Sequence, residues 1–141
     1  MNKNYIVGLV ASIREKSRAF LENELRQRGI KGIVAAHGSV LGLLYRHGGS
    51  LQMTEIAEKI GRSKSTMTTL IATLEKHGYV RKVQNEADRR GTFVVLTDSA
   101  WALKPVFEEI SAKLIETVYS GFTDAEQDVI MKLLVRVRDN L

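Results

Sequence analysis

The sequence contains no cysteine, and only one proline among 141 residues. Without cysteine the chain can form neither a disulfide framework nor a thiol-based redox switch. No apolar run approaches the roughly 18 residues that a membrane-spanning helix requires, and no signal-peptide pattern opens the sequence. We therefore expect a cytoplasmic protein without a membrane partner.

Motifs that carry catalytic or metal chemistry are also missing. The sequence has no GxSxG, no Walker loop, no dinucleotide fingerprint and no HExxH spacing. Its histidines are His37, His47 and His77, and the first two stand too far apart on one expected helix to share a metal. The sequence thus predicts no enzyme, no catalytic residue, no cofactor and no metal site, although metal sensing by a histidine stays open.

Charge is unevenly distributed along the chain, whose net charge is +5. Residues 1–50 hold eight basic and three acidic side chains, and residues 51–97 hold eight and five. Residues 98–141 reverse the balance, with five basic and eight acidic side chains. A basic lobe fits a nucleic-acid partner, but ribosomal and membrane-surface proteins share this composition.

Two short helices joined by a turn are expected at Met53–Gly61 and Lys64–His77. The second has one apolar stripe at i, i+3, i+4 and i+7, formed by Met67, Leu70, Ile71 and Leu74. Ser63 stands at the N-cap position, where its hydroxyl can accept from N–H groups of the first turn. Gly78 can adopt the left-handed conformation that ends the helix.

The opposite face of this second helix is crowded with hydroxyl groups. It carries Lys64, Ser65, Thr66, Thr68, Thr69, Ala72, Thr73 and Lys76. Solvated helix faces usually carry Glu and Lys, which form helices better than Ser and Thr do. Short hydroxyl side chains let a helix approach a DNA groove closely and bond base edges or phosphates. Together with the preceding helix and the strands that follow, this face favours DNA recognition over an ordinary solvated surface.

After this helix the pattern changes to that of strands. Residues 79–84 and 92–96 are rich in β-branched and aromatic side chains and predict a two-stranded ribbon. Its polar tip contains Asp88, Arg89 and Arg90. Arginines on such a tip suit a minor groove, whose negative potential attracts cations, and Asp88 can fix a neighbouring guanidinium. In isolation they would be a solvated charge pair.

Four further helices are expected outside this segment, at residues 4–28, 35–47, 98–120 and 124–141, the third capped by Asp98. Thr123 and Glu126 have the spacing of a capping box. The last helix has an apolar stripe formed by Ile130, Leu133, Leu134, Val137 and Leu141. The stripe of the first helix is broad, and that of the last helix extends to the final residue. We therefore expect the first helix and the last two helices to build a dimer interface.

Several motifs resemble the MarR family of bacterial transcriptional regulators. They are Ser63–Thr68, Leu74–Val80, Asp88–Arg90 and Val95–Thr97. Two positions depart from the family pattern, because Ala100 stands where Gly is frequent and Gln52 where Thr or Ser is frequent. The flanking helices agree in number and order, so the resemblance covers nearly the whole chain.

The resemblance implies one MarR-like domain over residues 1–141, mainly α with a small β-hairpin wing (α+β). Residues 51–97 would be the winged helix-turn-helix DNA-binding lobe, and residues 1–30 and 98–141 the helical dimerisation region. It implies a homodimeric regulator, usually a repressor and sometimes an activator, whose DNA affinity responds to a small, often aromatic, effector.

In this interpretation each protomer places the second helix in a major groove of a pseudo-palindromic operator, with half-sites about 10 bp apart. The expected DNA contacts are Ser63, Lys64, Ser65, Thr66, Thr68, Thr69, Thr73, Asp88, Arg89 and Arg90. The candidates for an effector site are His37, Arg46, His47 and Trp101. Ordinary packing at a helix crossing accounts for these four equally well.

Two other classes stay open. One is a winged-helix protein-interaction module, although such a module would normally lack the basic tip kept here. The other is a ligand-sensing or metal-sensing dimer with little specific DNA binding. The dependence of DNA binding on salt and sequence separates both from a regulator.

The double substitution Arg89→Ala, Arg90→Ala should lower DNA affinity and flatten its salt dependence. Each lost phosphate contact reduces the slope of log K against log[salt] by about 0.9. Fluorescence anisotropy over a range of salt concentrations measures both quantities. A variant that binds DNA as tightly as the parent at matched salt excludes a role for these arginines.

Overall fold

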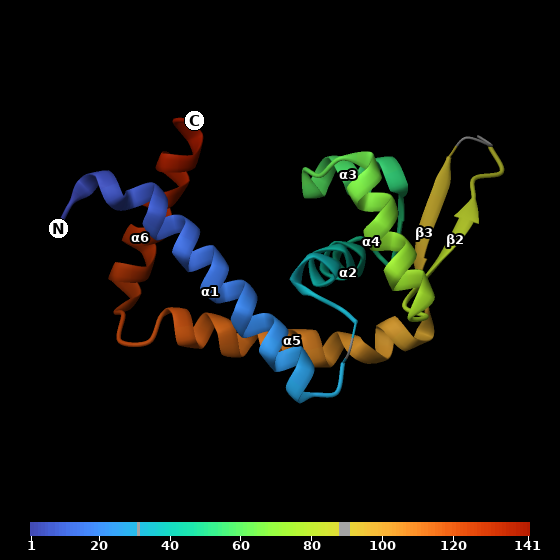
Figure 1. Ribbon diagram of the computed structural model, residues 1–141, viewed down its shortest axis with the longest axis horizontal. Coiled ribbons are helices and arrows are strands. Elements are labelled where there is room, and N and C mark those ends of the chain that lie inside the picture. Colours follow the sequence, from blue (N-terminus) through green and yellow to red (C-terminus); the bar gives the residue numbers. More distant parts are fainter. Residues whose placement is uncertain (31, 88–90) are drawn as a thin grey trace.

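The computed structural model describes residues 1–30, 32–87 and 91–141 (Figure 1). A short 3-10 turn at Lys3–Tyr5 precedes the helices α1 (Ile6–Gln27), α2 (Ala35–Arg46), α3 (Met53–Ile60), α4 (Lys64–Lys76), α5 (Asp98–Val118) and α6 (Asp124–Asp139). The strands are β1 (Ser50–Gln52), β2 (Val80–Gln84) and β3 (Thr92–Leu96). The predicted α+β fold with a small wing is confirmed. Among the described residues, no helix is long and apolar enough to cross a membrane.

α5 extends along the base of the molecule and connects its two ends (Figure 1). At one end it follows β3 and packs against α2, on the side of the molecule that holds α3 and α4. Toward the other end α1 crosses it, and α6 follows α5 at that end. Both chain termini lie at this second end. The helix-turn-helix segment and the expected dimerisation helices therefore occupy opposite ends of one long helix.

The sheet has three antiparallel strands in the order β1-β3-β2. The expected ribbon is present as β2 and β3, with Val80 opposite Leu96. A third strand was not predicted: β1 pairs with the other edge of β3 and places Leu51 opposite Val94. A three-residue strand is too short to show an alternating pattern, so β1 could not be predicted from the sequence.

The hydrophobic core lies between α2, α3, α4, the sheet and α5. Its fully buried side chains are Val40, Leu41, Leu44, Ile56, Met67, Ile71, Leu74, Val94 and Ile110. The predicted stripe of α4 is thus confirmed at three positions, while Leu70 at its edge is half-buried. This core fixes α4 through one face and leaves the opposite face free.

The start of α5 differs from the prediction by one residue. Thr97, not Asp98, is the N-cap, and its hydroxyl accepts from the N–H of Ala100 at 3.3 Å. Asp98 is the first helical residue, where its negative charge still favours the positive end of the helix dipole. Both residue types cap helices well, so composition alone does not separate them. The capping box of Thr123 and Glu126 is confirmed at the start of α6.

Two adjacent glycines end α2 in the left-handed region, with φ of 73° at Gly48 and 91° at Gly49. A Cβ at Gly49 would lie 2.6 Å from Cζ2 of Trp101, whereas a Cβ at Gly48 would meet no atom within 4 Å. The Gly49 carbonyl also accepts from the N–H of Leu96 at 2.8 Å. Close approach of Trp101 therefore requires glycine at position 49 only.

Gly49→Ala should destabilise the protein more than its matched control Gly48→Ala. Both variants force alanine into the left-handed region, which costs about 1–2 kcal/mol, but only Gly49→Ala also displaces Trp101, at a further cost of about 1–3 kcal/mol. Urea unfolding measures both free energies. Equal losses would show that the indole ring moves aside freely.

Candidate nucleic-acid interface

The turn between α3 and α4 occupies residues 61–63. Gly61 ends α3 in the left-handed region, with φ of 74°, and its N–H donates to the Ala57 carbonyl at 2.9 Å. Ser63 then begins α4 as predicted, because its hydroxyl accepts from the N–H of Thr66 at 3.2 Å. These contacts form the expected helix-turn-helix.

The carboxyl end of α4 has a double hydrogen bond around Gly78, whose φ is 78°. The N–H of Tyr79 donates to the Leu74 carbonyl at 2.9 Å, and the N–H of Gly78 donates to Glu75 at 3.0 Å. This is the Schellman arrangement that ends a helix with glycine. The chain then enters β2, so the helix end sets the direction of the wing.

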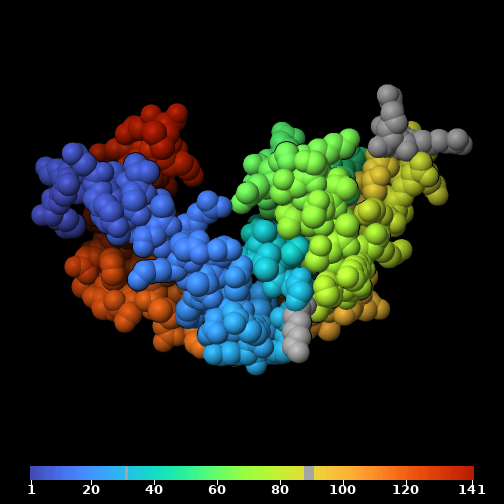
Figure 2. All heavy atoms as spheres, in the orientation of Figure 1, coloured from blue at the N-terminus to red at the C-terminus, as the bar shows by residue number. Residues whose placement is uncertain are grey.

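The hydroxyl-rich face of α4 is uncovered, as the green surface in Figure 2 shows. Lys64, Ser65, Thr66, Thr68 and Thr69 are exposed and Thr73 is half-buried. Three of its hydroxyls donate to backbone carbonyls four residues earlier: Thr68 to Lys64 at 2.9 Å, Thr69 to Ser65 at 3.2 Å and Thr73 to Thr69 at 3.2 Å. The structure thus gathers the predicted residues of α4 on one open face.

The wing is closed by the N–H of Asn85, which donates to the Gly91 carbonyl at 2.9 Å. The predicted contacts Asp88, Arg89 and Arg90 lie outside the described residues. Basic side chains that the sequence analysis did not single out also surround α4: Arg62 in the turn, and Arg81 and Lys82 on β2, all exposed. Their positions in the sequence could have identified them, because Arg62 directly precedes the N-cap of α4 and Arg81 and Lys82 lie on the strand that follows this helix.

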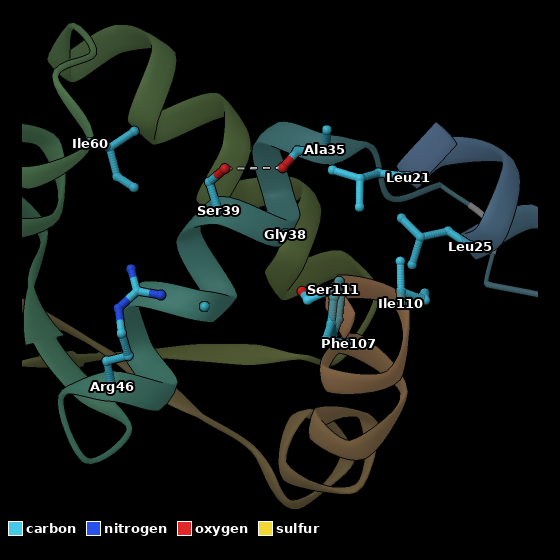
Figure 3. Close-up of a pocket in the computed structure, with 11 residues that line it drawn as sticks. Leu21, Leu25, Ala35, Gly38, Ser39, Arg46, Ile60, Phe107, Ile110 and Ser111 are labelled. Carbon is cyan, nitrogen blue, oxygen red and sulfur yellow. Dashed lines mark hydrogen bonds between the residues drawn. The ribbon is translucent and has the colours of Figure 1, made fainter. Parts of the chain in front are cut away.

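A cavity of about 330 Å³ lies between α1, α2, α3 and α5 (Figure 3). Its apolar wall includes Leu21, Leu25, Ile60, Phe107 and Ile110. Arg46 extends from α2 into the lining, and no ion pair of its guanidinium is found in the described parts of the chain. The cavity thus has a largely apolar wall and one cationic side chain, that of Arg46.

The four candidates for an effector site are not brought together. Arg46 lines the cavity, whereas His47 is exposed at the end of α2. Trp101 packs against Tyr45, and the centroids of the two rings are 5.6 Å apart. His37 is buried at the start of α2. Residues 1–30, 32–87 and 91–141 contain no cluster of three or more His, Cys, Asp or Glu that would hold a metal.

His37 has a structural role that its sequence position did not reveal. Its Nδ1 accepts from the N–H of Val34 at 3.0 Å and so satisfies the first backbone donor of α2. Nδ1 can accept only while the imidazole is neutral. Burial lowers the pKa of His37 below its usual value, and the neighbouring His77 lowers this pKa further.

His37→Gln should reduce the loss of stability that acid causes in the parent. An unfolded histidine titrates near pH 6.5, and the folded pKa of His37 is lower, so the unfolded state binds more protons as the pH falls through this window. Folding stability therefore declines below about pH 6.5 in the parent. Gln at this position keeps the backbone acceptor without titrating.

Urea unfolding at several pH values between about 7.5 and 5 measures this effect. His47→Gln is the control, because His47 is exposed on the same helix. A His37→Gln variant that loses stability as steeply as the parent would contradict this role of His37.

Comparison with known proteins agrees with the fold and the motifs. The model of the MarR family matches residues 34–92. The chain is similar to the HTH-type transcriptional regulator YwaE of Bacillus subtilis, with 38% identity over 94 residues, or 66% of this chain and 54% of that protein. It thus spans about half the length of that curated relative.

Two solved structures extend the likeness to nearly the whole chain. The transcriptional regulator PA3341 is 32% identical, with a TM-score of 0.79 over 96% of this chain and 97% of that one. MepR of S. aureus, solved as a complex with DNA, has a TM-score of 0.87 and 23% identity over 100% and 99% of the two chains. Motifs, fold and relatives agree, and the chain belongs to the MarR family, whose members are transcriptional regulators and not enzymes.

Proposed function

We propose that this protein is a homodimeric repressor that binds a specific DNA sequence in the cytoplasm and is released by a small effector. The observation that supports DNA binding best is the open, hydroxyl-bearing face of α4 beside a wing with basic side chains. The complex of MepR with DNA shows that a protein of this fold binds DNA. Residues 51–97 are the proposed DNA-binding lobe.

The proposed dimer would cover apolar side chains at the end of the molecule away from α4. Exposed side chains of α1 include Ile6, Val7, Leu9, Val10 and Ile13, and those of α6 include Val129, Met131, Leu133, Leu134 and Val135. No residue of α6 is buried. Apolar patches of this kind mark interaction surfaces, and both helices lie at the end of the molecule away from α4 (Figure 1). Residues 1–30 and 98–141 are thus the proposed dimerisation region.

A two-fold dimer would place two copies of α4 in successive major grooves of a pseudo-palindromic operator. Ser63, Lys64, Ser65, Thr66, Thr68, Thr69 and Thr73 are the proposed contacts from α4. Asp88, Arg89 and Arg90 are the proposed contacts at the wing tip, where the arginines would meet a minor groove or phosphates.

The cavity beside Arg46 is the proposed effector site, and it fits a small aromatic anion. Leu21, Phe107 and Ile110 would contact an aromatic ring, and the Arg46 guanidinium would pair with its charge. Because the walls come from α1 and α5 as well as α2 and α3, a ligand there can favour one arrangement of the two ends. An arrangement that spaces the α4 helices wrongly would release the DNA.

The test begins with selection of bound duplexes from a random DNA library, since the operator is unknown. Anisotropy at physiological salt then compares the selected duplex with a scrambled one. A regulator should prefer the selected duplex by about 1,000-fold or more. Benzoate, as a simple aromatic anion, should weaken this binding in the parent more than in Arg46→Met, which keeps the length of the side chain without the charge.

Recovery of no consensus, with equal weak binding to both duplexes, would exclude a sequence-specific regulator and leave only a basic surface. A dimer that binds no DNA would favour a protein-interaction module. Benzoate release that is equal in the parent and in Arg46→Met would exclude the cavity as the effector site without affecting the DNA-binding proposal.

A further inference from the structure

We infer that α4 reads its operator through thymine methyl groups and the amino groups of adenine or cytosine, not through the acceptor atoms of guanine. This inference rests on the proposed function, because it assumes that α4 enters a major groove. Its basis is the direction of the hydrogen bonds that the threonines of α4 make within their own helix.

Thr68, Thr69 and Thr73 each use their hydroxyl proton inside α4. The three hydroxyls donate to the carbonyls four residues earlier at 2.9, 3.2 and 3.2 Å. A hydroxyl has one proton and two lone pairs. With the proton directed at the helix backbone, each of these side chains offers the solvent side an acceptor oxygen and a methyl group.

Such a surface is selective in a major groove. Adenine N6 and cytosine N4 present N–H donors there, thymine presents a C5-methyl group, and guanine presents the acceptors N7 and O6. An acceptor oxygen matches the amino groups, and a threonine methyl matches the thymine methyl. Bonding a guanine acceptor would require the hydroxyl to break its helix bond, and the net gain would be small.

Apolar contact is concentrated at the centre of the face. Thr68, Thr69 and Ala72 are all exposed. Ala72 lies four positions after Thr68 and three after Thr69, so it neighbours both on one side of the helix. Together they present three methyl groups in the region that would lie deepest in the groove. Alanine and threonine methyl groups are the side-chain partners of thymine.

α4 carries no side chain that would override this preference at its centre. Residues 64–76 contain no Arg, Asn or Gln, which are the usual bidentate readers of guanine and adenine. Its two lysines, Lys64 and Lys76, are the first and last residues of the helix. The carboxylate of Glu75 lies 3.7 Å from the ammonium group of Lys82 on β2.

The hydroxyls at the start of α4 differ from those at its centre. Thr66 Oγ1 accepts from the Ser63 hydroxyl at 2.9 Å. Across the described parts of the chain, no acceptor for the Thr66 hydroxyl proton is found. Donors beside a helix N-terminus suit phosphate oxygens. We therefore assign phosphate binding to the first turn and base reading to the three following threonines.

The test uses the selected operator with single-atom changes in its bases. Uracil in place of thymine removes only the C5-methyl group, and 7-deazaguanine in place of guanine removes the N7 acceptor. Loss of one buried methyl contact should weaken binding about fourfold, at roughly 0.8 kcal/mol per group. Uracil at the half-site centres should produce this loss, whereas 7-deazaguanine there should leave affinity unchanged.

Two substitutions of Thr69 separate the contribution of its methyl group to DNA binding from that of its hydroxyl. Thr69→Ser keeps the hydroxyl and removes the methyl, so it should weaken binding to the thymine operator and lose its sensitivity to uracil. Thr69→Val keeps a methyl and should stay sensitive to uracil. The two variants are matched controls for each other, because each changes only one small group of the same side chain.

Specific binding that responds to 7-deazaguanine but not to uracil would overturn this inference and leave the proposed function intact. Equal uracil sensitivity in the parent and in Thr69→Ser would also overturn the role of the Thr69 methyl. Failure to select any operator would instead overturn the proposed function. Thermal unfolding of each variant confirms that it is folded, so lost affinity reports the contact itself.

Discussion

The orientation of α4 depends on one threonine at the junction of three elements. The Thr97 hydroxyl donates to the Gly78 carbonyl at 2.5 Å and accepts from the N–H of Ala100 at 3.3 Å, while its own N–H donates to Tyr79 at 3.1 Å. The residue that begins α5 therefore also binds the end of α4 and the start of the wing. The start of α5 and the carboxyl end of α4 are therefore joined directly through a single residue.

α5 is in turn joined to α1 by a cluster of charges around Glu24. This carboxylate is buried, and it accepts from Lys113 of α5 at 2.6 Å and from Arg28, the residue directly after α1. Hydrogen bonds from these two cations hold the pKa of Glu24 below its usual value. A buried carboxylate without its partners is costly, so the crossing of α1 over α5 is fixed where the cavity begins. α5 therefore connects the α1 wall of the cavity, through Lys113, with the carboxyl end of α4, through Thr97.

Sequence patterns predicted the elements with long-range periodicity and missed those set by single contacts. The stripe of α4 and the capping box at Thr123 follow from local rules, and both are present. β1 exists only because β3 offers an unpaired edge, which three residues of sequence cannot show. His37 caps α2 through a ring nitrogen rather than a carboxylate or amide, so the usual capping pattern does not include it.

In the candidate site, too, the sequence predicted the residues of the surface but not the individual hydrogen bonds that they make. Composition alone identified the hydroxyl-rich face of α4, because a surface helix rarely gathers so many Ser and Thr residues. Which way each hydroxyl proton points depends on the helix carbonyls beneath it, and that became visible only in three dimensions. The chemical meaning of the face follows from this detail. A threonine with a free hydroxyl proton could donate to guanine, whereas one that donates to its own backbone presents an oxygen and a methyl group. In the proposed complex with DNA, this difference would make a general groove-binding surface selective.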